Sequence, residues 1–481
     1  IKPFYYSLNE NRFLFASEIK SLLVWEDMPR QIRTESLLNF LTFQYVPQPW
    51  TMFEGIRKLP AAHYVKVTPD GGFRIHRYWD PMFEPRERKF DEVIEEIRAK
   101  LHDSVVHHMV SDVERGCFLS SGIDSTAIAA HMKRVEPIRT FSVGFEGPNN
   151  ETVIARQTAE ALGTEHYDKV ITRGEFFETL PKAIWHQDEP VADPSAIALY
   201  HVAQLARQHV TVVLSGEGAD ELFGGYRIYR EPLALRPLSW LPLPLKRLFH
   251  RLAKLLPEGL PGRNYILRGT TPLEERFLGN AKIFSEDLKA EMLKISREML
   301  DNYEKPADIA AGYYERTKHL DPVSRMQYID MNLWLEGDIL MKADKMTMAH
   351  SLELRVPFLD KELFEVARQI PVSYRINRGT TKYVFRRAME GIVPDFILHR
   401  PKLGFPVPMR EWLRGPLGNR LLEEIEASGI ETYVHMDKVS DMLYLHQKGQ
   451  GDYSRRLWTL YVFALWHMAY MEDGSKEAIA V

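Results

Sequence analysis

Cysteine is almost absent from this sequence. The 481 residues contain one, Cys117, so no disulfide can form within the chain. A long chain with a single thiol is typical of proteins in a reducing compartment, and we expect a cytoplasmic protein.

An excess of charge of one sign is also missing. Lysine and arginine number 62, aspartate and glutamate 66, and the net charge is −4. Domains that bind duplex nucleic acid or anionic membranes through electrostatics usually carry a clear positive excess. We therefore expect neither nucleic acid nor a membrane among the partners of this chain.

Long hydrophobic runs are missing as well. The most apolar stretch, residues 457–471, is shorter than the roughly 20 residues of a membrane-spanning helix and contains Thr459 and His467. This stretch predicts a buried helix. No apolar segment follows residues 2–4, so the first residues do not resemble a secretory signal.

Residues 233–256 allow two interpretations. Basic side chains stand among many leucines: Arg236, Lys246, Arg247, Arg251 and Lys254. A basic amphipathic helix can bind a membrane surface. We favour a surface helix whose apolar side packs on the core, because prolines in and after this segment keep any continuous helix short.

The composition that remains is that of a folded globular protein, with 45% hydrophobic and 27% charged residues. At about 150 residues per domain, the length predicts two or three domains. Residues 1–80 alternate short apolar runs with turn signals, which predicts strands at 5–6, 12–15, 63–67 and 73–75 and helices at 18–24 and 34–43. We predict an α+β unit over 1–80, a linker over 81–90 and a larger domain over 91–481.

Apolar strands alternate with amphipathic helices in the larger domain. The pattern predicts strands at 116–119, 140–145 and 210–214, and helices at 91–109, from about 125, and at 151–162. This alternation predicts an α/β fold in which helices cover both faces of a parallel sheet. From about residue 232 onward the pattern predicts helices and no clear strand.

The segment Leu119 to Thr126 follows the first of these strands directly and leads into a helix. Its small residues let backbone N–H groups approach an anion, and the helix amino end adds partial positive charge. A carboxylate in such a phosphate cradle repels the phosphate unless a cation lies between them, so Asp124 suggests Mg²⁺. A serine-rich helix cap explains the local pattern equally well.

A second loop, residues 214–226, follows the strand 210–214. It contains three carboxylates and four glycines. Loops after two strands of one parallel sheet lie at the same edge, so this loop could supply a second carboxylate to the same ion. Its alternative interpretation is an acidic turn before a helix.

The first loop resembles the pyrophosphate loop of ATP pyrophosphatases. Together, the two loops resemble those of the glutamine-hydrolysing asparagine synthetase family. Further segments agree with that family along essentially the whole chain: residues 45–47, 53–56, 342–350, 353–360, 382–388 and 400–405. The resemblance implies an ATP pyrophosphatase domain with a helical C-terminal part, preceded by the remainder of an amino-terminal-nucleophile glutaminase domain.

The resemblance also implies the reaction. L-Aspartate would be amidated to L-asparagine through a β-aspartyl-adenylate, with ATP giving AMP and pyrophosphate and with L-glutamine or ammonia giving the nitrogen. The implied catalytic residues are Glu217 and Lys382, and the implied Mg²⁺ ligands are Asp124 and Asp220. The implied ATP-binding residues are Leu119, Ser120, Ser121, Gly122, Asp124, Ser125, Val143, Gly144, Ser215 and Gly216. Candidate residues near the substrate are Asp344, Lys345 and Arg355. The resemblance leaves room for a homodimer.

This sequence departs from the family pattern at two points. Ser121 replaces the first glycine of the cradle, which a backbone cradle tolerates if φ stays negative. Family members begin with a catalytic cysteine, and residues 1–20 resemble the last part of their glutaminase domain. We expect that nucleophile to lie before Ile1, because Cys117 sits inside the strand that leads into the cradle and is expected to be a buried core thiol. The 481-residue chain is then expected to use ammonium.

Three other functions remain open from the sequence. A related synthetase could amidate or cyclise another carboxylate. A regulatory relative could bind ATP without catalysis, although Asp124, Asp220, Glu217 and Lys382 argue against it. A nucleic-acid-modifying pyrophosphatase is disfavoured by the balanced charge.

Overall fold

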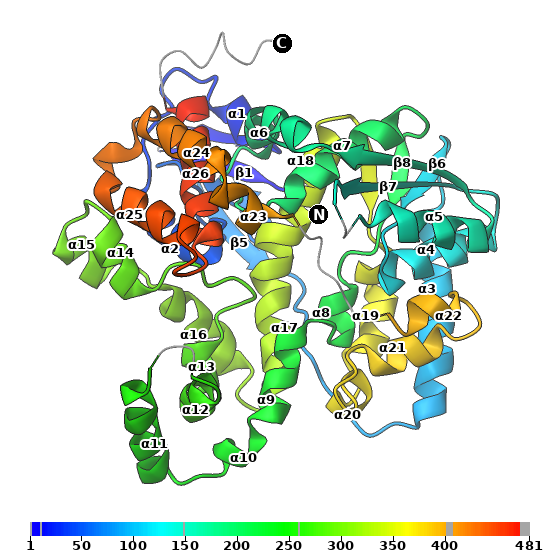
Figure 1. The fold of residues 1–481 in the computed structure, drawn as a ribbon. Helices are drawn as coiled ribbons and strands as arrows, with labels where there is room; N and C mark the ends of the chain where they lie inside the picture. Colours follow the sequence, from blue (N-terminus) through cyan, green and yellow to red (C-terminus); the bar gives the residue numbers. More distant parts are fainter. Residues whose placement is uncertain (1, 10–11, 148–149, 258–259, 401–406, 472–481) are drawn as a thin grey trace.

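A five-stranded parallel sheet forms the centre of the larger domain in the computed structural model, which describes residues 2–9, 12–147, 150–257, 260–400 and 407–471 (Figure 1). Its strand order is β10-β9-β6-β7-β8, and every neighbouring pair is parallel. The strands are β6 (Arg115–Phe118), β7 (Arg139–Phe145), β8 (Glu165–Ile171), β9 (Val212–Leu214) and β10 (Glu353–Arg355). The predicted α/β fold with a parallel sheet is confirmed.

Alternating side chains of these strands enter two separate hydrophobic cores. Phe118 and Val213 belong to a core that includes α6 (Arg173–Gln187) and α7 (Ser195–Arg207). Their neighbours Cys117 and Leu214 belong to a second core. That core includes α3 (Phe90–His108), α4 (Ile123–Lys133) and α5 (Thr152–Leu162). Successive side chains on a strand point to opposite faces, so helices cover both faces of the sheet as predicted.

Two strands differ from the prediction. β8 carries a run of half-exposed polar residues, because it is an edge strand and lacks a continuous apolar pattern. β10 lies at the other edge, and its three residues are too few to produce a periodic pattern. The expectation of no strand after residue 232 is therefore wrong.

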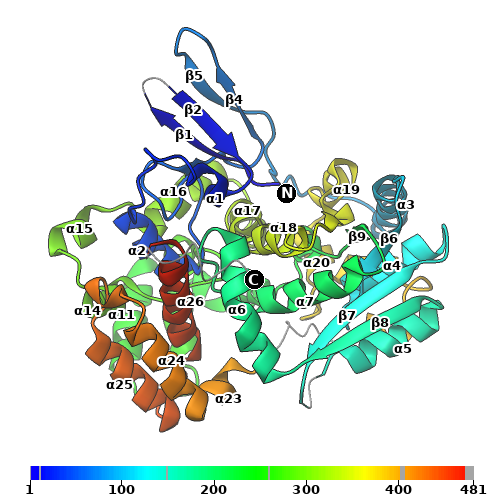
Figure 2. The same ribbon diagram turned by 90° about the horizontal axis from the view of Figure 1, so that it is seen from above.

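The amino-terminal segment forms small antiparallel sheets. β1 (Tyr5–Asn9) pairs with β2 (Arg12–Ala16) and β3 (Arg57–Lys58), and β4 (His63–Val67) pairs with β5 (Phe73–Arg77). The predicted strands in this part and the helix α2 (Thr34–Phe43) are confirmed, whereas α1 (Ile19–Leu22) is shorter than predicted. Figure 2 shows the two hairpins projecting to one side of the molecule. The segment 9–11, whose Asn-Glu-Asn sequence predicts a hairpin turn, lies partly outside the described residues.

One hydrophobic core joins this segment to the last helix, α26 (Ser454–Tyr470). Phe53 packs edge-on against Trp466, with ring centroids 5.2 Å apart, and Phe40 lies 6.4 Å from Phe463. The predicted buried helix near residues 457–471 is thereby confirmed. Within the described ranges, no helix is both long and apolar enough to cross a membrane.

Short helices make up most of the remaining chain. They are α8 (Ala219–Phe223), α9 (Glu231–Ala234), α10 (Arg236–Ser239), α11 (Leu243–Leu255), α12 (Arg263–Thr270), α13 (Leu273–Arg276), α14 (Glu286–Met292), α15 (Arg297–Asn302), α16 (Pro306–Arg316), α17 (Pro322–Asn332), α18 (Met341–Met348), α19 (Lys361–Ala367), α20 (Val372–Arg375), α21 (Tyr383–Ala388), α22 (Asp395–Leu398), α23 (Met409–Arg414), α24 (Pro416–Glu426) and α25 (Met436–Gln447). A π-helical turn, Leu335–Leu340, precedes α18.

Residues 233–256 do not pack as expected. Prolines divide the segment into α9, α10 and α11, in agreement with the sequence. However, Ala253 is the one residue of α11 that is buried, and its leucines are exposed. The expectation that the apolar side of this helix packs on the core is wrong.

Candidate active site

The loop after β6 is held in shape by its own hydroxyl groups. The Ser120 N–H donates to Ser125 Oγ at 3.0 Å, and the Gly122 N–H donates to Ser120 Oγ at 3.2 Å. Gly122 then caps the amino end of α4. Ser121 is not among the residues with positive φ, so a serine fits here as expected. The backbone of the loop is thus held near the positive end of an eleven-residue helix.

The loop after β9 passes directly against this helix end. A Cβ on Gly216 would lie 2.8 Å from the backbone nitrogen of Ser125 and 3.0 Å from the Asp124 carbonyl carbon. Only a residue without a side chain allows this approach. β6 and β9 are neighbours in the sheet, so the predicted meeting of the two loops at one edge is confirmed.

Lys382 connects the two loops. Its Nζ lies 2.6 Å from an Asp124 oxygen and 2.7 Å from an Asp220 oxygen, and the lysine side chain is almost fully buried. Burial alone would lower the pKa of Lys382, but the two carboxylates outweigh this effect and raise the pKa. The lysine has a left-handed backbone with φ of 53° and stands immediately before α21.

Glu217 is the third acidic group at this edge. Its carboxylate accepts a hydrogen bond from the Ser215 hydroxyl. Burial raises the pKa of the Glu217 carboxyl, while the hydroxyl opposes the shift by stabilising the charged form. A carboxyl group with a raised pKa is suited to accept a proton near neutral pH.

These residues line one cavity of about 420 Å³, a volume within the range of nucleotide and small-molecule sites. The structure brings together twelve of the predicted site residues there: Leu119, Ser120, Ser121, Gly122, Asp124, Ser125, Val143, Ser215, Gly216, Glu217, Asp220 and Lys382. Cys117, in β6, is not among the residues that line the cavity. It is fully buried, and burial raises the pKa of its thiol, as expected of a core thiol.

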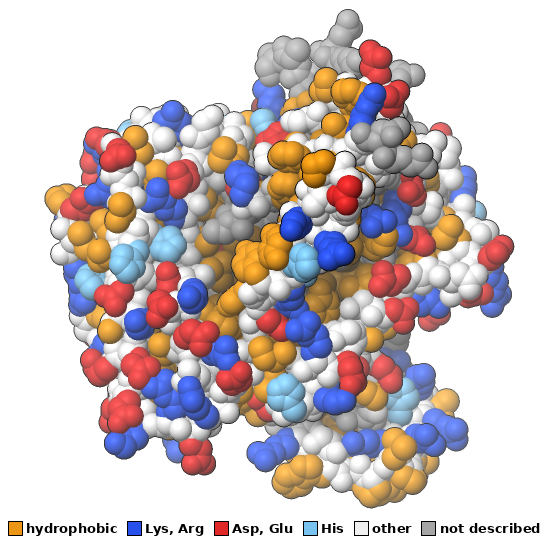
Figure 3. Space-filling view, turned by 180° about the vertical axis from the view of Figure 1, so that it is seen from behind, with side chains coloured by type: hydrophobic (Ala, Val, Ile, Leu, Met, Phe, Trp, Pro, Cys, Tyr) orange, Lys and Arg blue, Asp and Glu red, His pale blue; other side chains and the backbone are white. Residues whose placement is uncertain are grey.

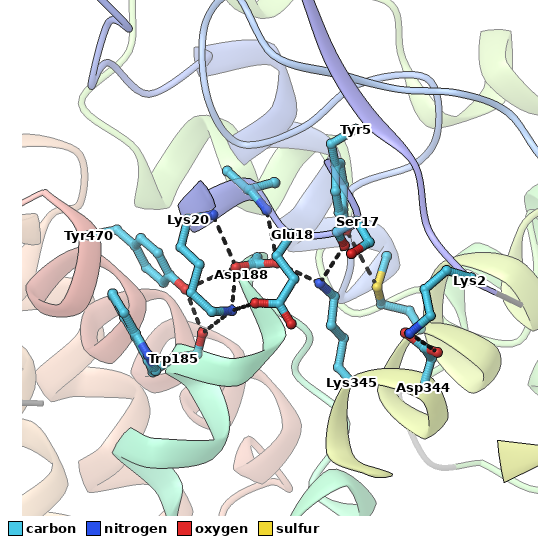
Figure 4. Close-up of polar contacts among 12 residues, drawn as sticks. Lys2, Tyr5, Ser17, Glu18, Lys20, Trp185, Asp188, Asp344, Lys345 and Tyr470 are labelled. Carbon is cyan, nitrogen blue, oxygen red and sulfur yellow. Dashed lines mark hydrogen bonds and ion pairs between the residues drawn. The ribbon is translucent and has the colours of Figure 1, made fainter. Parts of the chain in front are cut away.

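Four predicted residues lie outside this lining: Gly144, Asp344, Lys345 and Arg355. Asp344 pairs with Lys2 at 2.8 Å, and Lys345 pairs with the buried Asp188 at 2.5 Å (Figure 4). Arg355 donates to the His108 and Val110 carbonyl oxygens. The three charged residues connect parts of the fold, and Asp344 and Lys345 join α18 to the amino-terminal segment.

The structure adds a charged group that the sequence interpretation did not select. Lys342 lines the cavity and pairs with Asp193, which also lines it, and with Asp338 at 2.8 Å. All three residues are largely buried. The signal in the sequence was the Asp338–Lys342 spacing of four residues within an apolar helical stretch, which favours an ion pair. The aromatic rings of Tyr226 and Trp334 complete this side.

The donor set fits a magnesium ion bound together with a phosphate. In the described part of the chain, no group of three or more His, Cys, Asp or Glu side chains could hold a metal ion. Mg²⁺ bound with nucleotides typically takes only one or two protein carboxylates and uses phosphate oxygens and water for the rest. Asp124 and Asp220 both converge on Lys382 Nζ, so they can provide such a pair.

The sequence of this chain matches two known protein families. A family model described as asparagine synthase matches residues 96–468, and one described as a glutamine amidotransferase domain matches residues 1–79. The chain belongs to the asparagine synthase family. Asparagine synthase family proteins of the glutamine-hydrolysing type are ligases, and the resemblance seen in the sequence is confirmed.

The chain is similar in sequence to several named members of the asparagine synthase family and to a fungal amidase. It is 45% identical to asparagine synthetase [glutamine-hydrolyzing] 1 of Bacillus subtilis, over 98% of this chain and 74% of the relative. It is 30% identical to asparagine synthetase [glutamine-hydrolyzing] 3 of the same organism, over 84% of this chain and 63% of the relative. It is also 26% identical to amidase chry2 of Gibberella zeae, over 91% of this chain and 70% of the relative.

Proposed function

We propose that this chain catalyses ATP-dependent amidation of L-aspartate through a β-aspartyl-adenylate, with release of AMP and pyrophosphate. The observation that carries the proposal is the convergence of the two loops and Lys382 on one cavity. The names of the relatives give asparagine as the product and glutamine as the compound hydrolysed. Aspartate is the carboxylic acid whose amidation yields asparagine.

ATP would bind with its pyrophosphate part on the loop after β6. Ser120, Ser121, Gly122 and Ser125 line the cavity at the amino end of α4. Their hydroxyl and backbone N–H groups would exchange hydrogen bonds within the loop for bonds to the phosphate oxygens. Leu119, Val143, Gly144, Ser215 and Gly216 would border the adenosine. Gly144 follows the lining residue Val143 in β7 and would contribute through its backbone.

Two anions must meet when the aspartate carboxylate attacks the α-phosphate. Asp124 and Asp220 would hold Mg²⁺, which neutralises phosphate charge when bound. Lys382 would then turn its ammonium group toward the phosphates and act as a point charge. The carboxylates already hold this lysine in its charged form, so no proton has to be taken up.

Glu217 would support formation of the adenylate and accept a proton from the attacking ammonia. Its burial and raised pKa favour proton uptake once nitrogen attacks the activated carboxyl group. AMP is the leaving group, and the β-carboxamide is the product. Asp344, Lys345 and Arg355 would act indirectly, by holding the elements around the cavity.

The nitrogen source follows from the residues present. Glutamine hydrolysis in this type of enzyme needs a reactive thiol, and the one thiol in these 481 residues is the buried Cys117. We therefore infer that the 481-residue polypeptide takes nitrogen from ammonium. A longer chain with an accessible cysteine before this segment would take it from glutamine.

The test is product formation by the 481-residue chain with ATP, Mg²⁺ and aspartate. We expect asparagine, AMP and pyrophosphate in equal amounts with ammonium, and no asparagine with glutamine alone. Glutamine-dependent synthesis would overturn the nitrogen assignment. Loss of activity when Mg²⁺ is chelated, and its return on addition, checks the metal assignment.

A second candidate is amidation of a different carboxylate, which the similarity to the fungal amidase supports. Pyrophosphate release measured across a panel of carboxylic acids separates the two. Aspartate should stimulate release most. A stronger response to another acid would keep the adenylation site and change the acceptor.

A further inference from the structure

A lobe at one end of the molecule carries an unusual surface. Figure 1 shows α10, α11 and α12 projecting away from the sheet, and Figure 3 shows hydrophobic and basic side chains together on the projecting lobe seen from behind. The cationic amphipathic surface consists of Trp240 and eight exposed residues of α11. Its apolar members are Trp240, Leu245, Leu248, Phe249, Leu252 and Leu255, and its basic members are Arg247, Arg251 and Lys254.

The apolar members form one stripe along the helix. The spacing of residues 245, 248, 249, 252 and 255 is three or four, which places them on one side of α11. Arg247, Arg251 and Lys254 repeat at the same spacing on the opposite side. The neighbouring helix α12 packs against a different side of α11, where His250 Nδ1 lies 3.0 Å from Thr270 Oγ1. The stripe therefore faces solvent.

Exposure of this stripe is too great for an ordinary surface helix. Leu248 and Leu252 are each 50% exposed, Leu255 is 82% exposed, and Trp240, which precedes the helix, is 76% exposed. A contiguous apolar patch on a folded protein usually marks a contact with another apolar phase or molecule. Tryptophan and leucine on one side and lysine and arginine on the other are the composition of helices that lie in a membrane interface.

Charge distinguishes between the available partners. Residues 232–257 contain five basic residues and no acidic residue, within a chain whose net charge is −4. Glu231 and Glu258 flank this segment in the sequence, and Glu231 is already paired with Arg268 and Arg276. Two copies joined through this surface would place two segments with five basic and no acidic residues beside each other, which is repulsive. Anionic lipid headgroups above an acyl layer complement both the charge and the apolar stripe.

We propose that the cationic amphipathic surface binds this chain to anionic lipid bilayers, with α11 lying in the plane of the interface. The binding is peripheral and reversible, because a single short helix buries little apolar area and the attraction is screened by salt. The net charge of the whole chain does not reveal this local concentration of cations. The expectation of no membrane partner, which rested on that net charge, is therefore replaced by a proposed contact with anionic lipid surfaces.

The experiment is co-flotation of the whole 481-residue chain with vesicles. One set contains phosphatidylcholine with phosphatidylglycerol, and the other contains phosphatidylcholine alone. We expect flotation with the anionic vesicles at about 0.05 M NaCl, little flotation with the neutral vesicles, and at least a tenfold loss of bound protein at about 0.5 M NaCl. Protein that stays unbound with anionic vesicles at low salt overturns the proposal.

Two double variants locate the binding. Arg251→Gln with Lys254→Gln should lower the partition coefficient about fivefold per cation removed. Leu248→Ser with Leu252→Ser should lower it at least tenfold. All four side chains are exposed, so the melting temperature should stay unchanged. Controls are Val24→Ser, an exposed apolar residue elsewhere, and Lys89→Gln, an exposed lysine elsewhere.

The controls also distinguish the alternatives. If Val24→Ser or Lys89→Gln weakens flotation as much as the double variants do, the location is wrong. If Leu248→Ser with Leu252→Ser converts a dimer to a monomer in sedimentation and leaves flotation unchanged, the surface joins two copies and the proposal fails.

Discussion

Lys382 joins the loop after β6 to the loop after β9 by pairing with one carboxylate from each. Its ammonium group lies between Asp124 and Asp220, at 2.6 and 2.7 Å, in a position that is almost fully buried. Removing one partner of a buried ionic group leaves uncompensated charge, which usually costs about 3–5 kcal/mol. Here two carboxylates would lose their partner at once, and a divalent cation is the natural replacement.

Replacement of this lysine should reveal the metal site. We expect Lys382→Gln to reduce pyrophosphate release at least 100-fold, because the charge that faces the phosphates is lost. Its melting temperature should rise more on addition of Mg²⁺ than that of the parent chain. The matched control is Lys89→Gln, which removes an exposed lysine paired with Glu92. An active Lys382→Gln chain, or one with no response to Mg²⁺, would contradict the assignment.

Glu217 allows a test of chemistry without loss of structure. We expect Glu217→Gln to lower kcat by about 10²–10³, in the range found for removal of a general base. The amide keeps a hydrogen-bond partner for the Ser215 hydroxyl, so the melting temperature should change little. Aspartate-dependent exchange of pyrophosphate into ATP measures the first step by itself. Glu26→Gln, at an exposed site, serves as the control, and normal exchange in Glu217→Gln would sink the role in adenylation.

At the scale of elements, the site is a contact between a loop and a helix end. The loop after β9 reaches the first turn of α4 only because Gly216 has no side chain. Gly225 plays a similar part, since a Cβ there would overlap Lys382 and Asp220. The relative position of the two loops is thus set by backbone contact as well as by charge.

A methyl group at Gly216 should separate the loops. We expect Gly216→Ala to cost about 1–3 kcal/mol of unfolding free energy, as overpacking usually does, and to reduce pyrophosphate release at least tenfold. Gly312→Ala is the matched control: it lies in α16, and a Cβ there meets no atom within 4 Å. That variant should gain about 0.5–1 kcal/mol from the higher helix propensity of alanine. Equal stability and activity of both variants would show that the approach at Gly216 is not required.

At the scale of the whole molecule, buried charges connect the amino-terminal segment to the larger domain. Asp188 binds both Lys20 and Lys345, and the two lysines outweigh burial and lower its pKa (Figure 4). The adjacent Glu189 accepts a hydrogen bond from the Met52 N–H at 2.9 Å. Burial raises the pKa of Glu189 to about 8, although this N–H and Lys58 oppose the shift.

The raised pKa of Glu189 makes stability depend on pH. Between its unfolded value of 4.5 and about 8, the folded state alone holds the proton, so this contribution to stability is lost as pH rises. At about 1.4 kcal/mol per pKa unit, the loss reaches about 5 kcal/mol once the pH exceeds the folded pKa. Glu189→Gln removes this titration, so its unfolding free energy relative to the parent should increase from pH 5 to pH 8.

The comparison with the parent chain is essential for this measurement. Buried histidines such as His131, whose pKa burial lowers to about 3, contribute the opposite dependence below pH 6.5. They are present in both chains and cancel in the difference. Glu26→Gln should show a constant difference from the parent. A constant difference for Glu189→Gln would mean that this carboxyl is ionised in the folded state.

Much of this arrangement could be predicted from sequence, for physical reasons. The loops after β6 and β9 stand next to buried strands whose apolar runs are unambiguous, and parallel strands place their loops at one edge. Edge strands such as β8 lack that pattern. Contacts between distant segments, such as Lys342 with Asp193 or Lys345 with Asp188, depend on tertiary packing that no local pattern encodes.

The shared core also has a consequence for how this chain is made. Phe40 and Phe53 leave the ribosome early, whereas their partners Phe463 and Trp466 belong to the last helix. At about 5–20 residues per second, roughly 20–80 s of synthesis separate the two halves of this core. The apolar side of the amino-terminal part therefore stays uncovered during that time. Nascent chains that end before residue 454 should bind holding chaperones, and they should become compact only after α26 has been synthesised.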